Sequence, residues 1–195
     1  MSIDRLIKIK TNNLKPSKGK ILISEPFMGD YFFGRSVILL AEHNEEGSFG
    51  LIMNKPAPTP LNTVVKGLPD FDAPVYLGGP VQSDSLFFIH VLGDEIPESL
   101  EIMKGIYWGG NLETISEMIL LKAIRPDQIR FFIGYSGWDA NQLEGELKRN
   151  SWLVSKVNAQ SLLQTNPNKM WDRFLQKMGT EYAHWRKLPI DPQMN

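Results

Sequence analysis

Short apolar runs separated by turn residues dominate the chain, and they predict a β-rich fold. The runs are rich in Val, Ile, Leu and Phe and are bounded by Gly, Pro, Asn or Asp, which is typical of strands. We predict strands at 20–25, 35–42, 49–54, 75–77, 86–92, 129–135 and 152–157. The turn at 44–47 predicts a hairpin between the second and third strands. The nearly continuous apolar character of 129–135 indicates burial on both faces.

Helical periodicity is concentrated in the second half of the chain, after a short helix expected at 61–68. Asn111 is the expected N-cap of a helix that runs to Ile124, with an acidic residue in its first turn. Asp139 is expected to cap the next helix, with Gln142 as its capping-box partner. A further helix is predicted over 170–178 and ends at a glycine.

The order of these elements predicts the fold class. Strands and helices alternate irregularly, with a hairpin early and helices late. This order favours an α+β fold: a single domain with a mixed, largely antiparallel β-sheet flanked by helices. We divide the chain into a basic N-terminal arm (1–18), the domain (19–179) and a C-terminal tail (180–195). Pro189 and Pro192 indicate that the tail is a loose end.

The composition narrows the range of functions. The 195 residues include 21 Lys and Arg against 22 Asp and Glu, for a net charge of −1. This balance argues against a general nucleic-acid or membrane-surface binder. The chain has no cysteine, which excludes disulfides, iron–sulfur clusters and thiol nucleophiles. Because no apolar run approaches the roughly 20 residues that cross a bilayer, we expect a cytoplasmic protein. We interpret the basic arm as a solvated leader; contact with an anionic partner is the alternative.

Residues 134–138 (Gly-Tyr-Ser-Gly-Trp) follow a buried strand and precede a predicted helix, as a nucleophile elbow does. The elbow requires glycine where this chain has Trp138, and only His184 follows downstream as a triad partner. We therefore interpret the segment as a tight strand-to-helix turn, with Trp138 partly exposed where the helix starts. An anion at this turn would meet the carboxylate of Asp139, so nucleotide binding has weak support.

The three histidines predict no local metal pair, because His43, His90 and His184 are far apart in the sequence. We predict neither a metal nor another cofactor. His90 lies in an apolar strand, which favours a hydrogen-bonded core histidine. A long-range site of Asp30, His43 and His90 stays open as an alternative. Arg35 is expected to pair with Asp30 across a loop.

The order of motifs resembles the YqgE/AlgH family, also called UPF0301 or DUF179, over about residues 19–179. The motifs that carry the resemblance lie at 19–23 with Pro26 and Asp30, 33–40 with 42–43, Gly47 with 50–56, 75–81, His90, 134–138, 142–144 with 146–147, and Trp152. Ser136 stands where the family usually has alanine, which argues against a nucleophile there, and Lys55 stands where arginine is frequent. The resemblance implies an α+β fold with a mixed sheet, a bacterial cytoplasmic setting and no established activity. Some members carry a transcriptional-regulator label.

The candidate functional surface consists of motif residues: Asp30, Arg35, His43, Asn54, Gly79, His90, Tyr135, Trp138 and Gln142. The polar residues Asp30, Arg35, His43, Asn54 and Gln142 lie at the ends of predicted elements. Our leading hypothesis is a non-enzymatic binding or regulatory protein for an unknown small molecule or protein. One alternative is an enzyme that acts on a phosphorylated small molecule. It requires one pocket that collects Asp30, Arg35, His43, Asn54 and Gln142. The other is a transcriptional regulator, although the composition argues against DNA as a partner.

Overall fold

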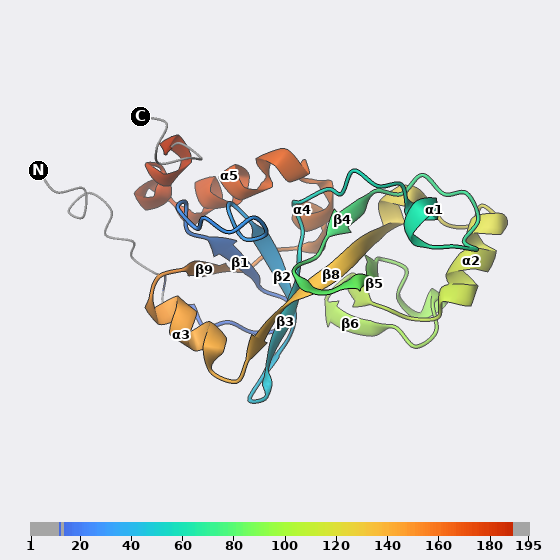
Figure 1. Ribbon diagram of the computed structural model, residues 1–195, viewed down its shortest axis with the longest axis horizontal. Helices are drawn as coiled ribbons and strands as arrows, with labels where there is room; N and C mark the ends of the chain where they lie inside the picture. The colour runs from blue at the N-terminus through green and yellow to red at the C-terminus, as the bar shows by residue number, and fades with distance from the viewer. Residues whose placement is uncertain (1–11, 13, 189–195) are drawn as a thin grey trace, which may run out of the picture.

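The computed structural model describes residue 12 and residues 14–188 and is built around one nine-stranded sheet. The strands run in the order β6-β7-β5-β8-β3-β2-β1-β9, with β4 beside β8 (Figure 1). Only the pairing of β4 with β8 is parallel among these strands. The strands are β1 (Ile21–Ser24), β2 (Val37–Asn44), β3 (Gly47–Ile52), β4 (Val75–Leu77), β5 (Val81–His90), β6 (Leu100–Met103), β7 (Ile106–Trp108), β8 (Ile129–Asp139) and β9 (Trp152–Ser155). The predicted α+β domain with a mixed, largely antiparallel sheet is confirmed.

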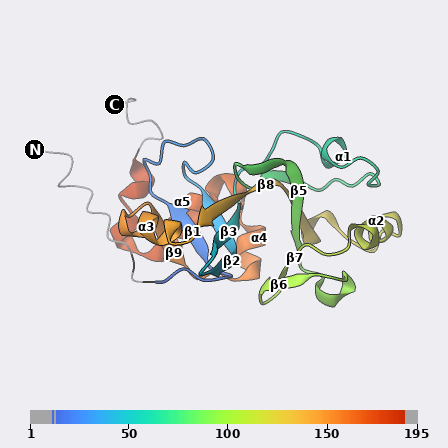
Figure 2. The same cartoon turned by 60° about the horizontal axis from the view of Figure 1, so that its bottom comes forward.

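Strand β8 joins the two halves of the sheet (Figures 1 and 2). Its first part pairs with β5 and β4, and residues 136–139 pair with β3. The prediction of a strand-to-helix turn at 134–138 is therefore wrong, because β3 continues the ladder along this segment. Gly134 has φ +67, and a Cβ there would lie 2.5 Å from the carbonyl oxygen of Gly79. The glycine thus permits a close approach of two backbones within the sheet.

Five helices in the described part of the chain flank the sheet, and asparagine side chains cap the N-termini of three of them. The helices are α1 (Leu61–Val64), α2 (Leu112–Leu120), α3 (Gln142–Lys148), α4 (Ala159–Gln164) and α5 (Pro167–Met178). Asn111 caps α2 as predicted, since its side chain accepts a hydrogen bond from the N–H of Thr114. The helix ends before Ile124 because Lys122 has φ +55, and the next N–H closes a Schellman turn. No helix in the described part of the chain has the length and apolarity to span a membrane.

Helix α3 begins later than predicted. Asp139 is the last residue of β8, and the N-cap is Asn141, with φ +63. The Oε1 atom of Gln142 still accepts a hydrogen bond from the N–H of Asp139 at 3.0 Å. The expected pair of residues thus meets, although it connects the strand end to the helix instead of capping the helix.

The hydrophobic core has three buried clusters. The largest packs α5 against one face of β1 and β2, and it includes Trp171 and Trp185. The third packs α3 against the other face of the same strands, with Trp138 and Trp152. The second cluster fills the half of the sheet beyond β8, under α1 and α2. Strand β8 contributes to all three, so its position is set from both faces.

The segment after α5 packs on the domain. Tyr182 and Trp185 are 3% and 1% exposed, and Arg186 donates two hydrogen bonds to Asp172 at 2.6 and 2.8 Å. The expectation of a loose end is therefore wrong for 180–188, because these aromatic side chains find apolar surface. Residues 1–11, 13 and 189–195, with most of the basic arm and both tail prolines, lie outside the described residues.

Candidate functional site

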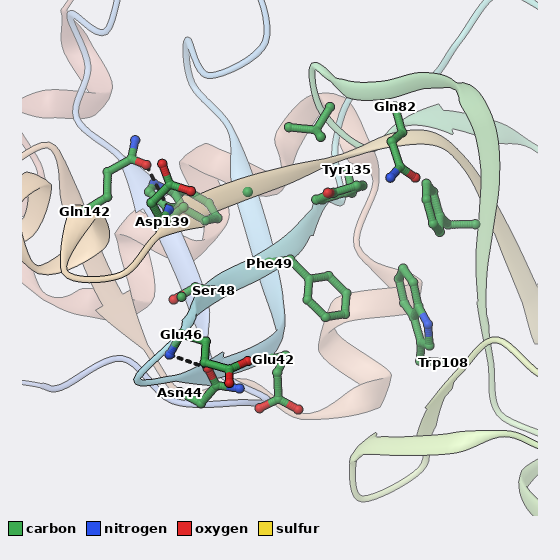
Figure 3. A pocket seen from close by; sticks show the side chains of 15 residues that line it. Glu42, Asn44, Glu46, Ser48, Phe49, Gln82, Trp108, Tyr135, Asp139 and Gln142 are labelled. Atoms are coloured by element: carbon green, nitrogen blue, oxygen red, sulfur yellow. Dashed lines mark hydrogen bonds between the residues drawn. The ribbon is translucent and has the colours of Figure 1, made fainter.

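The main candidate site is an open cleft of ≈ 710 Å³ where β3, β5, β7 and β8 meet (Figure 3). Its volume is within the usual range of small-molecule sites. Three of the predicted residues line it: Tyr135, Trp138 and Gln142. The other lining residues are Glu42, Asn44, Glu46, Gly47, Ser48, Phe49, Val81, Gln82, Phe87, Trp108, Gly137 and Asp139. We refer to this site as the cleft.

One side of the cleft is a wall of four half-buried aromatic rings, each from a different strand: Phe49, Phe87, Trp108 and Tyr135. The Phe49 ring lies 5.1 Å from Trp108 and 6.0 Å from Tyr135, and the Phe87 ring lies 5.4 and 5.5 Å from the same two rings. These centroid distances are typical of packed aromatic pairs. Gly137, opposite Phe49 in the ladder, leaves space beside the wall, because a Cβ there would lie 3.2 Å from the Tyr135 ring.

The rim facing this aromatic wall is acidic (Figure 3). Glu42, Glu46 and Asp139 contribute carboxylates, and no lining residue is Lys, Arg or His. Lys18 lies 3.9 Å from the carboxylate of Glu42, as an exposed pair. Within the described residues, the side-chain carboxylates of Glu46 and Asp139 accept no hydrogen bond and form no ion pair. The rim therefore carries negative charge that the described residues only partly balance.

Trp138 is held at the base of the cleft by Glu146. Trp138 is 6% exposed, so the prediction of partial exposure at a helix start is wrong. It lies in β8 and packs against Trp152 in the core cluster under α3. Its indole N–H donates to Glu146 Oε2 at 2.9 Å, and the indole of Trp152 donates to the same oxygen at 2.7 Å. Gln142 donates to Glu146 Oε1 at 3.1 Å. The carboxylate of Glu146 thus joins α3 to β8 and β9. The sequence patterns did not indicate this role.

Asp30, Arg35, Asn54 and Lys55 lie elsewhere, and we call them the backbone clamp because each bonds to main-chain groups. Asn54 is 9% exposed; its oxygen accepts from the N–H of Val37, and its NH₂ donates to the carbonyl of Arg35, both at 2.9 Å. One oxygen of Asp30 accepts two backbone N–H groups of its own loop at 2.8 and 3.0 Å. Lys55 donates to a backbone carbonyl at 2.7 Å, and burial lowers the pKa of its ammonium group.

Arg35 does not pair with Asp30, and that prediction is wrong. Its guanidinium lies over Trp171 of α5, 4.8 Å from the ring centroid, and donates to the carbonyl of Leu188. Burial lowers the pKa of Arg35, and the charge of Asp172 opposes this effect. Arg35, Asn54 and Lys55 line a separate, smaller cleft of ≈ 450 Å³. The side chain of Arg35 therefore connects the loop that precedes β2 to the segment that follows α5.

The two histidines of the candidate set occupy separate places. His90 is 1% exposed; its Nδ1 accepts from the N–H of Leu92 at 3.2 Å, and its Nε2 lies 3.1 Å from the carbonyl of Gly109. Burial lowers the pKa of His90, as expected for a neutral core histidine. His43 instead bonds Ser48 at 2.7 Å. Within the described residues, no cluster of acidic residues and histidines is arranged to hold a metal, so the Asp30, His43 and His90 site is not formed.

Gly79 and Ser136 serve the packing of β8. A Cβ on Gly79 would lie 2.3 Å from the carbonyl group of Tyr135, so only glycine fits. Ser136 is fully buried and donates to the carbonyl of Gly78 at 3.1 Å. Its hydroxyl is therefore inaccessible to a substrate, in agreement with the earlier rejection of a nucleophile at this position.

The nine predicted residues do not converge on one pocket. Tyr135, Trp138 and Gln142 line the cleft, and Arg35 and Asn54 line the smaller one. The remaining four, Asp30, His43, Gly79 and His90, line neither.

Arg130 is a structural residue that the sequence analysis did not identify. It is 8% exposed, lies over the ring of Tyr76 and donates hydrogen bonds to the carbonyls of Met53 and Leu163. It therefore fastens β8 to the chain around it.

Comparisons with known proteins agree with this description. A UPF0301 protein of Bacteroides thetaiotaomicron is 46% identical, and the match covers 100% of both chains. A UPF0301 protein of Cytophaga hutchinsonii is 43% identical over 92% of this chain and 99% of its own. The solution structure of the AlgH protein from Pseudomonas aeruginosa superposes with a TM-score of 0.70 at 28% identity, covering 92% and 98% of the two chains. A family model described as AlgH-like (DUF179) matches residues 21–183. The chain belongs to this AlgH-like family.

Proposed function

We propose that this protein is a non-enzymatic binding protein whose small-molecule ligand occupies the cleft, with a regulatory role in the cytoplasm. The observation that carries the proposal is the cleft itself: aromatic rings from four strands face a rim of carboxylates whose hydrogen-bonding capacity is largely unused. Side chains that are not committed to the fold are available for a ligand.

An enzyme acting on a phosphorylated small molecule has less support. That alternative needs Arg35 and His43 at one site with the glycine-rich segment, and the two side chains lie apart. A phosphate placed in the cleft would meet three carboxylates and no basic lining residue, an arrangement that repels it. The same charges disfavour a DNA backbone at this surface.

Binding at the cleft is tested by two-dimensional NMR of the ¹⁵N-labelled protein during titration with a panel of small metabolites. We expect shifts in the residues of β3, β7 and β8 that line the cleft, for at least one compound. The variant Trp108→Leu removes one ring of the wall and should weaken that compound's binding. Gln160→Ala, on an exposed residue of a different depression, is the control and should bind as the wild type does.

Four outcomes would count against the proposal. A panel without shifts, or with shifts that map outside the cleft, would contradict a small-molecule site there. Turnover of a panel compound would contradict the non-enzymatic part alone. For the regulatory alternative, a gel-shift titration over a range of salt concentrations is expected to show no binding to duplex DNA, and a salt-dependent complex would reverse that expectation.

A further inference from the structure

We infer that the ligand of the cleft is a small organic cation with an alkylated ammonium group. This inference rests on the proposed binding function and names the chemistry of its ligand. Two independent features of the cleft carry it: the charge of the rim and the aromatic surface of the wall.

The charge of the lining is entirely negative. Glu42, Glu46 and Asp139 face the cleft, and Lys18, which pairs with Glu42 at 3.9 Å, offsets only one of the three carboxylates. The other polar groups of the lining are neutral: the amides of Asn44, Gln82 and Gln142, the hydroxyls of Ser48 and Tyr135, and the tryptophan indoles. A concave site lined by one sign of charge concentrates counter-charged solutes. The rim thus selects cations over anions.

The aromatic wall adds a second attraction of the same sign. The face of an aromatic ring is negative and attracts cations, most strongly for tryptophan and tyrosine. Elsewhere in the described chain, protein cations already occupy such faces: Arg35 over Trp171, Arg130 over Tyr76 and Lys177 over Phe174. The four rings of the wall pack on one another, with Phe87 stacked on Trp108. No described Lys or Arg lies over them, so the ring surface that lines the cleft is available to a cation from solution.

The combination of carboxylates and aromatic rings in one cleft defines the kind of cation. A bare metal ion needs several ligands around it, and the described residues offer no such cluster. An alkylated ammonium instead presents methyl groups to the rings while its charge interacts with both the rings and the carboxylates. The site is also open and ≈ 710 Å³ in volume, which admits a small molecule carrying this group.

Choline and its neutral isostere 3,3-dimethylbutan-1-ol test the charge directly, because they have the same shape. Both are titrated into the full chain and followed by NMR at the indole N–H of Trp108. We expect choline to bind about fivefold more tightly than the alcohol, since a cation–π contact at an open site is worth up to about 1 kcal/mol. We also expect its affinity to fall as salt is added.

Paired variants locate the contact. Tyr135→Leu removes a ring of the wall and should weaken choline binding by about fivefold or more, whereas Tyr135→Phe keeps the ring and should bind as the wild type. Tyr107→Leu is the matched control, because Tyr107 is a half-buried neighbour on β7 that stacks on His90 and does not line the cleft. The NMR spectra also show whether each variant is folded.

The outcomes separate this inference from the proposed function. Equal binding of choline and the alcohol at the cleft overturns the cationic ligand and leaves the binding site in place. Choline binding that Tyr135→Leu does not change overturns the assignment of the cation to the wall. If choline fails to bind while a neutral or anionic compound of the metabolite panel shifts the cleft residues, only the cationic class is wrong. If no compound shifts them, both are wrong.

Discussion

The cleft and the backbone clamp contain similar residue types, but they use them differently. In the clamp, the polar groups of Asp30, Asn54 and Lys55 bond to main-chain atoms at 2.7–3.0 Å. In the cleft, the carboxylates of Glu46 and Asp139 have no such partner within the described residues. Polar side chains at the ends of strands therefore have two roles, and only their hydrogen-bond partners distinguish them. The clamp should respond to mutation through stability, and the cleft through binding.

The largest expected effect is at the centre of the clamp. Asn54→Ala leaves the N–H of Val37 and the carbonyl of Arg35 without their partner in a buried region. Each such group costs about 1–3 kcal/mol, so we expect the free energy of unfolding in urea to fall by about 4 kcal/mol. Glu46→Ala, at an exposed residue of the cleft whose carboxylate has no partner within the described residues, is the control and should change it by less than about 0.5 kcal/mol. Equal costs for the two variants would remove the distinction between the regions.

The next effect is expected at Glu146. This residue does not line the cleft, but its carboxylate holds Trp138 at the base of the cleft. Glu146→Ala removes the common acceptor of the Trp138 and Trp152 indoles, and we expect a loss of about 3 kcal/mol on urea unfolding. Glu146→Gln keeps one acceptor oxygen and should lose about half as much. A Glu146→Ala protein as stable as the wild type would show that the two indole N–H groups find water instead.

His90 sharpens the comparison through pH. Its pKa is lowered in the folded protein by burial, whereas the unfolded chain takes up a proton near pH 6.5. Stability from this group is therefore complete above about pH 6.5 and falls as the pH drops toward the folded pKa. His90→Gln cannot be protonated, so the difference in unfolding free energy between wild type and variant should shrink on acidification from pH 8 to pH 5. If the difference in unfolding free energy stays constant with pH, His90 is not held in its neutral form by the fold.

Local patterns predicted most of the fold but little of the site. The apolar runs located the β1–β3 strands and the centre of β8, and Asn111 located the start of α2, because these signals depend on neighbours in the sequence. The segment 134–138 was misinterpreted because its partner β3 lies far away in the sequence, and glycines suggested a turn. Tyr135 and Gln142 were predicted and line the cleft. Phe49, Phe87 and Trp108 were not, since each is an ordinary strand residue until sheet register brings the rings together.

The smallest expected effect on stability is at the rim of the cleft. Asp139 is exposed, and its carboxylate has no partner within the described residues, so Asp139→Asn should change the free energy of unfolding by less than about 0.5 kcal/mol. The same change removes one of the three rim charges and should weaken choline binding by about twofold, with a smaller dependence on salt. Asp127→Asn, an exposed carboxylate outside the cleft that pairs with Arg125, is the control for charge alone and should leave the affinity unchanged. If the two variants weaken binding equally, the net charge of the protein attracts the cation and the rim does not. If only Asp139→Asn weakens it while stability holds, the rim acts on the ligand directly, as uncommitted side chains should.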